Sequence, residues 1–324
     1  MREHAEDVGK SVRLPLLAIL LRRGLLRKSV RAGILAGAPH PTKPHLLPST
    51  HAERMAFKER GHGAIPPASW GLHVDPNPHA PLQATWYDGK GKQQPRYSKA
   101  HTEAAKTQKF ENLAHFSDQF PHIQAKVHAD LQHPGAHPDR VRAAVVRLMA
   151  HTAIRVGGAK YAEENGTYGA SSLRKSHVHL GEDGHSIHVK FPGKHGVEQS
   201  ASLSDPHLHA ALSHLKSLPG DALFQQRTRS GGLSPVNEGH VNEYLHTFGG
   251  AHAHQFRHHA ATEIVRAHLS AAPWSANPKE RNKHVNAAAQ KAADKLGNSA
   301  AMARNSYINP SVIEHYHAGK LHGQ

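Results

Sequence analysis

HVHLGEDGHSIHVKF, residues 177–191, separates an all-helical interpretation of this chain from a mixed one. Apolar and polar residues alternate on both sides of the turn at Gly181–Gly184, and this pattern predicts two antiparallel strands joined by a tight loop. We expect a second turn at residues 192–196 and a third strand through Val197. A hairpin of this kind, set among helical segments, favours an α+β fold.

Helical periodicity surrounds the hairpin. Apolar residues at helical spacing follow Pro138, and we expect that helix to run to Arg155, beside Gly157-Gly158. Further helices are predicted over residues 254–269, from Pro278 to a stop at Gly297, and from Pro310 onward.

Three regions follow from the spacing of turns and helices. Residues 1–50 are basic and rich in Pro and His, and we expect an extension or a poorly ordered arm there. Residues 51–101 show short apolar pieces broken by turns, with strands expected near 72–74 and 82–86. Residues 102–324 are mainly helical. The predicted class is therefore α+β, with a small β-rich domain before a larger, mainly α-helical domain that contains the hairpin or a three-stranded sheet.

Composition excludes several classes of protein. The 324 residues include no cysteine, so disulfide frameworks, Cys-based zinc sites and thiol nucleophiles are absent. Forty Lys and Arg against 25 Asp and Glu give a net charge of +15, which favours an anionic partner. The most apolar run, residues 14–21, is far shorter than the about 20 residues of a spanning helix. Arginines follow that run where a signal-cleavage region would lie, so we expect a cytosolic protein.

Four polar or basic residues and one tyrosine are candidates for chemistry. Taken singly, an arginine at the end of a helix usually lies in solvent and interacts with the helix dipole, a lysine in a turn is usually an exposed surface residue, and a tyrosine is usually a packing residue. The candidates are Arg155 beside Gly157-Gly158, Lys194 in a Gly-flanked turn, Arg257 between histidines, Asn298 after Gly297, and Tyr307 shortly before Asn309-Pro310.

These candidates lie in an ordered set of segments: RVGGAKYAEENGTYG (155–169), SLRK (172–175), FPGKHG (191–196), FR (256–257) and LGNSAAMARNSYINP (296–310). In this order they resemble the type IB DNA topoisomerases, in the short branch shared by bacteria and poxviruses. IPP (65–67), DPN (75–77), QAT (83–85) and RY (96–97) extend the resemblance, which covers about residues 60 to 324. Any one segment is a weak signal, whereas the ordered set is a strong one.

The resemblance implies a chemistry. A tyrosine oxygen attacks a DNA phosphodiester to give a 3′-phosphotyrosyl link and a free 5′-hydroxyl, which allows strand swivelling and religation without ATP or metal. Tyr307 would be the nucleophile, and Arg155, Arg257 and Asn298 would donate to the non-bridging oxygens. Lys194 would protonate the leaving 5′ oxygen. Residues 51–101 would be a DNA-binding domain and residues 102–324 the catalytic domain.

Two departures from the family pattern keep alternatives open. Many members have histidine where this chain has Asn298. Asparagine can still donate a hydrogen bond, but it cannot transfer a proton as histidine can. The family usually has lysine where this chain has His254, and the resulting His254-x-x-Arg257 spacing is that of tyrosine recombinases. A site-specific recombinase is therefore the first alternative. A catalytically silent, His-rich DNA- or metal-binding protein is the second.

Further residues are expected to contact DNA, each with a solvated or half-buried structural role as the alternative. They are Gln83, Tyr87, Arg96 and Tyr97 in the small domain, and Tyr161, Arg174 and Lys175 after the first arginine. We expect double-stranded DNA as the partner of a monomer associated with the nucleoid, with no cofactor and no membrane.

The 33 histidines are scattered, and we expect them to be surface residues rather than metal ligands. His254 and His258 have the i, i+4 spacing of a ligand pair, but no Asp or Glu occupies a matching position. Because imidazoles protonate near pH 6.5, DNA affinity at fixed salt should rise as the pH falls through that range.

Overall fold

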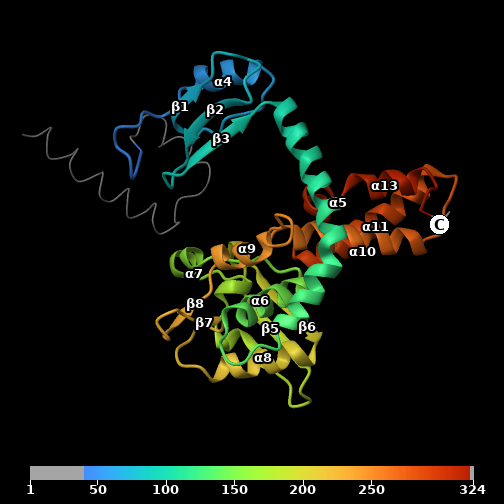
Figure 1. Cartoon of the computed structure of the whole chain (residues 1–324). Helices are drawn as coiled ribbons and strands as arrows, with labels where there is room; N and C mark the ends of the chain where they lie inside the picture. The colour runs from blue at the N-terminus through green and yellow to red at the C-terminus, as the bar shows by residue number, and fades with distance from the viewer. Residues whose placement is uncertain (1–39, 322–324) are drawn as a thin grey trace, which may run out of the picture. The chain divides into compact units, whose positions relative to one another are not determined.

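The computed structural model describes residues 40–321. Within the described residues the chain divides into two compact units, one before and one after the boundary between Lys109 and Phe110 (Figure 1). The division falls inside one long helix, α5 (Lys99–Asp130), eight residues beyond the boundary expected at 101. Most of the predicted N-terminal extension, including the apolar run 14–21, lies outside the described residues.

The first unit is a three-stranded antiparallel sheet with a helix packed on it. The strands β1 (Trp70–Val74), β2 (Leu82–Tyr87) and β3 (Gln93–Tyr97) lie in sequence order. The helix α4 (His51–Glu59) buries Phe57 against Ile65, Ala84 and Trp86. The strands expected near 72–74 and 82–86 are β1 and β2, and β3 completes the sheet. The helix was missed, although Thr50 and Glu53 form a capping box at its start.

Residues 40–50 belong to this unit rather than to a separate arm. Their backbone bonds to the edge of the sheet, from Ser49 N–H to the Ser69 carbonyl at 2.8 Å and from Gly71 N–H to the Leu47 carbonyl at 2.8 Å. The His40 side chain is buried, with Nε2 2.7 Å from the Asp88 carbonyl oxygen. The predicted extension therefore does not reach residue 50.

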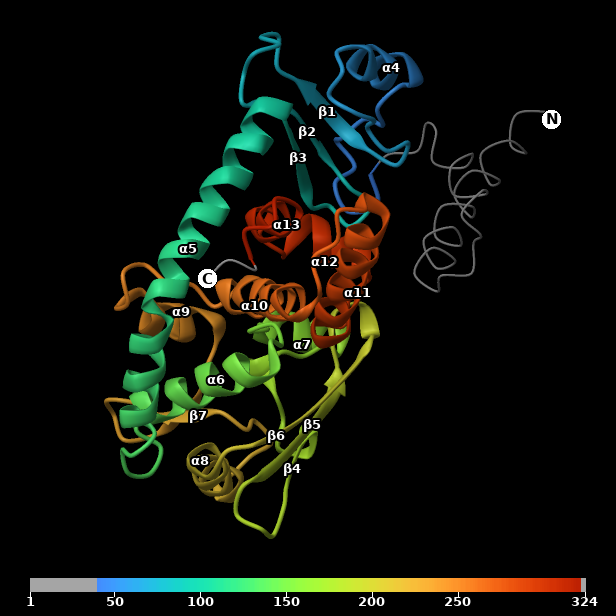
Figure 2. The same cartoon turned by 90° about the vertical axis from the view of Figure 1, so that its right-hand side faces the viewer.

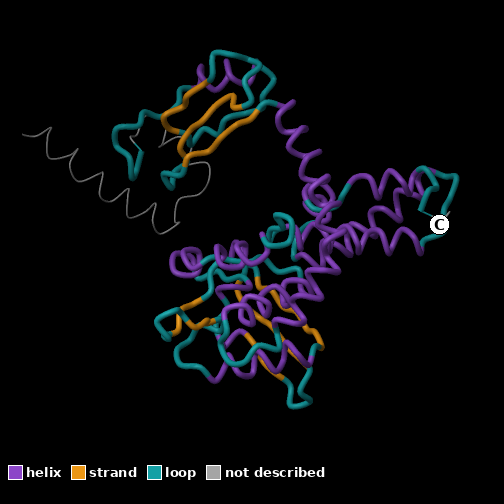
Figure 3. The backbone as a smooth tube through the Cα atoms, in the orientation of Figure 1, coloured by secondary structure: helices purple, strands orange, loops and turns teal. Residues whose placement is uncertain are grey.

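The second unit is mainly helical with one three-stranded and one two-stranded sheet, and Figure 3 shows its strands among many helices. Its helices after α5 are α6 (Pro138–Thr152), α7 (Ala159–Asn165), α8 (Pro206–Ser217), α9 (Glu238–His246), α10 (Gln255–Ala271), α11 (Pro278–Leu296), α12 (Ala300–Ser306) and α13 (Pro310–His317). Its strands are β4 (Val178–Leu180), β5 (Ser186–Pro192), β6 (Glu198–Ser204), β7 (Gln225–Arg227) and β8 (Leu233–Pro235).

The predicted hairpin is present, and it extends into a three-stranded sheet in the order β4-β5-β6 (Figure 2). Val178 pairs with Val189, and Leu180 pairs with Ile187. Ile187, Val189 and Phe191 are buried in the core, while the residues between them are exposed. The alternation therefore has its expected cause, one face against the core and one toward water. The third strand begins at Glu198, just after Val197. The α+β prediction is confirmed.

Two hydrophobic cores build the second unit. The larger one packs α6, α8 and α9 with the sheet, and the smaller one packs α10, α11 and α13. The helix α6 ends at Thr152 rather than near Gly157, because Ala153 takes a left-handed conformation at φ 55°. Arg155 therefore lies in an extended segment after the helix, not at its end. No helix within residues 40–321 combines the length and apolarity needed to cross a membrane.

Candidate active site

Arg155 is held by a close approach of two backbone segments. The N–H groups of Ala170 and Ser171 donate to the carbonyls of Arg155 and Val156 at 2.8 and 2.7 Å. A Cβ on Gly157 would lie 2.6 Å from Gly169 Cα, so only glycine permits this contact. Gly157 also has φ 78°, where other residues are strained. The glycines that accompany the arginine in the sequence thus fix its backbone.

Arg257 joins three parts of the unit. It lies in the first turn of α10 and is 3% exposed. Its Nη1 donates to the carbonyl of Ala153, at the end of α6, and its Nη2 donates to the carbonyl of Leu296, at the end of α11, at 2.9 Å. Burial, and then the neighbouring charge of Arg155, lower the pKa of Arg257 to about 10, which leaves it charged at neutral pH.

Tyr307 lies against both arginines. Its backbone follows α12, and its ring is half-buried. Arg155 Nη2 is 3.5 Å from the phenol oxygen, and the Arg257 guanidinium carbon lies 5.1 Å from the ring centroid. Burial raises the pKa of Tyr307, but the positive charges of Arg257 and Arg155 outweigh it and the net pKa is lowered. The surroundings favour the phenolate, which is the nucleophilic form.

These three side chains and Lys194 line one cleft of about 330 Å³. Lys194 is exposed and begins the turn Lys194–Gly196, in which His195 and Gly196 have positive φ values of 65° and 75°. The other lining residues are Val156, Gly157, Tyr161, Thr167, Tyr168, Glu238, Ala253 and His254. Four of the five candidate side chains, distant in the sequence, therefore share one cavity.

Asn298 does not line the cleft. It follows the left-handed cap Gly297 at the end of α11, and its backbone N–H donates to the Ala293 carbonyl at 3.0 Å. In the part of the chain that the structure describes, its side-chain Nδ2 is a buried donor without a hydrogen-bond partner, and so is Nε of Arg257. Buried donors left unpaired are costly, and an incoming acceptor such as a phosphate oxygen would satisfy them.

Comparison with known proteins places this cleft in a family. Residues 98–320 match the family model described as eukaryotic DNA topoisomerase I, catalytic core. The chain is a type IB DNA topoisomerase. DNA topoisomerase 1B of Acanthamoeba polyphaga mimivirus is 29% identical over 261 residues, which are 78% of this chain and 77% of that protein. The predicted family, enzyme class and DNA substrate are thereby confirmed.

Two solved structures of a recombinase align with part of this topoisomerase. The XerH site-specific recombinase bound to difH substrate, in a pre-cleavage complex, aligns with a TM-score of 0.36 and 15% identity over 60% of this chain and 51% of that chain. A post-cleavage complex of XerH on palindromic difH aligns with a TM-score of 0.35 and 17% identity over 57% and 47%. This likeness is too slight to favour recombination over relaxation.

Two residues received no catalytic role from the sequence: Glu238 lines the topoisomerase cleft, and His258 packs against Tyr307 without lining it. His258 is 4% exposed, and its ring centroid lies 5.1 Å from that of Tyr307. Its Nδ1 lies 3.0 Å from the His254 carbonyl, which fixes the ring. Glu238, the first residue of α9, adds a carboxylate to an otherwise cationic cleft. The sequence drew attention to His258 only through its position beside Arg257 and its i, i+4 spacing from His254, which was considered for a metal.

The DNA contacts expected after the first arginine divide into two groups. Tyr161 lines the cleft and is 57% exposed, so it is available to a ligand. Arg174 and Lys175 do not line it. The guanidinium of Arg174 lies 5.5 Å from the Tyr168 ring centroid, and Lys175 Nζ donates to the Leu218 carbonyl. The Lys175 ammonium therefore already supports the backbone.

In the first unit, Gln83 is misassigned as a DNA contact. It is fully buried, and its Nε2 donates to the carbonyls of Asn77 and Ala80 at 3.1 and 2.6 Å, so it holds a loop. Tyr97 is 44% exposed and stacks on His101. Arg96 donates to the Ala64 carbonyl at 2.9 Å, and Tyr87 carries Lys43 Nζ 4.0 Å from its ring centroid.

Proposed function

We propose that this enzyme relaxes supercoiled DNA by cutting one strand, allowing it to swivel and resealing it, without ATP or metal. The Tyr307 oxygen attacks the phosphorus, a 3′-phosphotyrosyl bond forms, and the bond to the 5′ oxygen breaks. Religation reverses these steps. One phosphoester replaces another, so no external energy source enters the balance.

The cleft residues divide the work. Arg155 and Arg257 donate to the non-bridging oxygens, where negative charge grows in the transition state. Lys194 gives a proton to the leaving 5′ oxygen, and the phenol proton of Tyr307 is lost to solvent. Asn298 adds a neutral donor when the phosphate is bound, although it stands outside the cleft in the free protein.

One observation carries this proposal: the phenol oxygen of Tyr307 lies 3.5 Å from Arg155 Nη2 and beside the Arg257 guanidinium. A tyrosine whose task was packing alone would not need two buried or half-buried cations at its ring. Perturbed ionisable groups gathered in a cleft mark functional sites.

The test is relaxation of supercoiled plasmid in chelator without ATP. The unmodified enzyme should relax the plasmid, and Tyr307→Phe should not. Tyr316→Phe is the matched control, because Tyr316 lies in the same unit but outside the cleft, with its hydroxyl 2.5 Å from His284 Nδ1. Relaxation by Tyr307→Phe would overturn the assignment of the nucleophile.

A site-specific recombinase is the second candidate, and the observation in its favour is that His254 lines the cleft three residues before Arg257. Strand exchange confined to matching sites would establish it.

We also propose that the enzyme acts as a monomer at the nucleoid in the cytoplasm. Relaxation rates proportional to enzyme concentration, and co-localisation of a fluorescent fusion with DNA, test these two points.

A further inference from the structure

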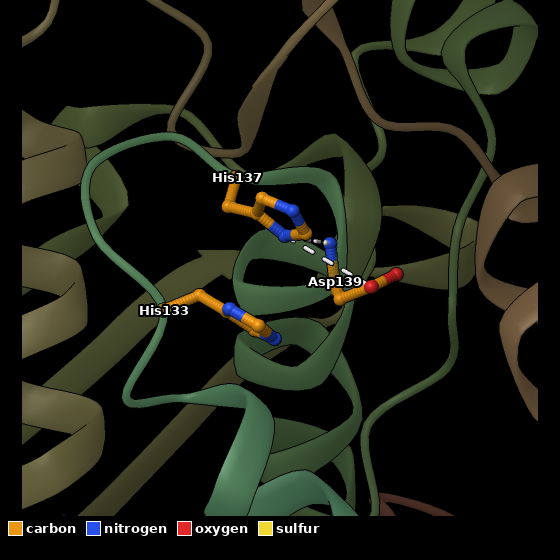
Figure 4. Close-up of side chains that lie close together, drawn as sticks. All are labelled: His133, His137 and Asp139. Carbon is orange, nitrogen blue, oxygen red and sulfur yellow. Dashed lines mark hydrogen bonds and ion pairs between the residues drawn. The ribbon is translucent and has the colours of Figure 1, made fainter.

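A second group of chemically active side chains lies outside the cleft, where the turn after α5 meets the start of α6. His133, His137 and Asp139 each offer a ligand atom, and these atoms lie within 4.8 Å of one another. Figure 4 shows the two imidazole rings one above the other, with the Asp139 carboxylate beside His137. Within residues 40–321 no other group of three or more His, Asp or Glu meets this spacing.

In its neutral form each imidazole carries one proton, so one ring nitrogen keeps a lone pair that can bind a metal ion. His133 Nε2 lies 3.5 Å from the Asp130 carboxylate, which favours the proton on Nε2 and leaves Nδ1 as an acceptor. His137 Nδ1 accepts the backbone N–H of Asp139 at 3.2 Å, so it carries the lone pair of its ring, and an ion bound to Nδ1 would replace this hydrogen bond. That nitrogen is 3.9 Å from Asp139 Oδ2.

Two carboxylates complete the arrangement in different ways. Among the residues described, none donates a hydrogen bond to the Asp139 carboxylate, whose charge is therefore open to a cation. Asp130 is 2% exposed and already accepts from Tyr244 at 2.6 Å and from Lys126. Asp130 therefore suits the outer position, where a carboxylate orients a ligating histidine through its second nitrogen.

We propose that His133, His137 and Asp139 form a binding site for a divalent transition-metal ion of the zinc class. Two imidazoles and a carboxylate are ligands that Zn²⁺ takes, with water completing the shell. Ligands of tetrahedral zinc lie about 3.3 Å apart, so the set must contract and the stacked rings must turn. All three residues are partly exposed, which leaves room for that adjustment.

The bound ion would join the end of α5 to the start of α6, the helix that leads to Arg155. This role is structural and does not depend on the proposed reaction, since the three residues lie outside the cleft. We expected no metal site from the sequence because no acidic residue accompanies His254 and His258. The new set was hidden, because its ligands come from a turn and a helix start that only the fold brings together.

The experiment is equilibrium binding of Zn²⁺ to the metal-stripped full chain at neutral pH, competed against a chelating dye. One equivalent should bind more tightly than the background from the other histidines. His133→Gln and Asp139→Asn, which keep side-chain size, should each weaken that equivalent at least tenfold. Zn²⁺ should also raise the thermal midpoint of the unmodified chain, and raise it less in both variants.

The matched control is His246→Gln. His246 contacts His252 at 4.4 Å between ring centroids, but within residues 40–321 this pair has no third ligand within reach. The control should keep the tight equivalent. The proposal is overturned if no tight equivalent exists, or if all three variants bind Zn²⁺ alike. Circular dichroism in chelator establishes that each variant is folded before binding is compared.

Discussion

Arg155→Ala and Arg257→Ala should both abolish efficient strand cleavage, but only the second should destabilise the protein. Loss of one donor to a developing negative charge costs about 10²–10³ in rate, or roughly 2.7–4 kcal/mol. We expect each variant to lose about that much in single-turnover formation of the covalent adduct on a nicked duplex.

The stabilities differ because the two side chains have different partners. Arg257 donates to the carbonyls of Ala153 and Leu296, which are left without these donors when it is removed. Each buried unpaired group costs about 1–3 kcal/mol, so the sum is roughly 2–6 kcal/mol. The Arg155 side chain bonds only to the Tyr307 hydroxyl among the described residues, and its loss should change the free energy of unfolding by less than about 0.5 kcal/mol.

Urea unfolding followed by circular dichroism measures this difference. With a denaturant slope of roughly 2 kcal/mol/M, Arg257→Ala should lower the urea midpoint by roughly 1–3 M, and Arg155→Ala should hardly move it. Equal destabilisation by both variants would refute the reasoning from their hydrogen bonds. Cleavage at the unmodified rate by either variant would refute its place in the reaction.

Further predictions concern the phenol and its supports. Because Arg257 and Arg155 lower the pKa of Tyr307, the single-turnover cleavage rate should rise with pH and level off below about pH 10, the pKa of free tyrosine. In Arg155→Ala the rate should level off at a higher pH than in the unmodified enzyme. Identical pH profiles of the two proteins would contradict this. Gly157→Ala should lower both the urea midpoint and the cleavage rate, since the new Cβ would lie 2.6 Å from Gly169. Gly220→Ala is the control, because Gly220 has a similar φ of 77° but open space around it, so this variant measures the effect of backbone strain alone. His258→Ala should slow cleavage roughly ten- to hundredfold at unchanged DNA affinity, because the Tyr307 ring loses a neighbour that holds it in place. His258→Phe, which restores a ring, should recover part of the cleavage rate. A change in DNA affinity without a change in rate would contradict this positioning role.

Elements with strong local signals could be predicted from the sequence. The hairpin followed from the alternation around Ile187 and Val189, and α11 from Pro278 at its start and Gly297 at its end. The end of α6 could not be predicted, because Ala153 takes a left-handed conformation that its residue type disfavours. The carbonyl of Ala153 accepts from Arg257, a residue 104 positions away in the chain. A tertiary contact of this kind leaves no local pattern.

The placement of side chains in one cleft was predictable only where an ordered set of motifs indicated it. The convergence of Arg155, Lys194, Arg257 and Tyr307 on one cleft agrees with the order of their segments in the sequence. Gln83 could not be placed in this way, because a glutamine on a strand faces either solvent or the core according to register, and here it is buried. Lys175 likewise was expected to hold phosphate, but its ammonium donates to a backbone carbonyl.

The most direct measurement of the central claim is the identity of the covalent link. The enzyme is incubated with a nicked duplex labelled at each strand end in turn and then denatured, and the linked peptide is sequenced by mass spectrometry. We predict a denaturation-stable adduct that joins Tyr307 to the 3′ phosphate and leaves a free 5′-hydroxyl. An adduct through another residue, a link to a 5′ phosphate, or DNA binding without any adduct would contradict the account.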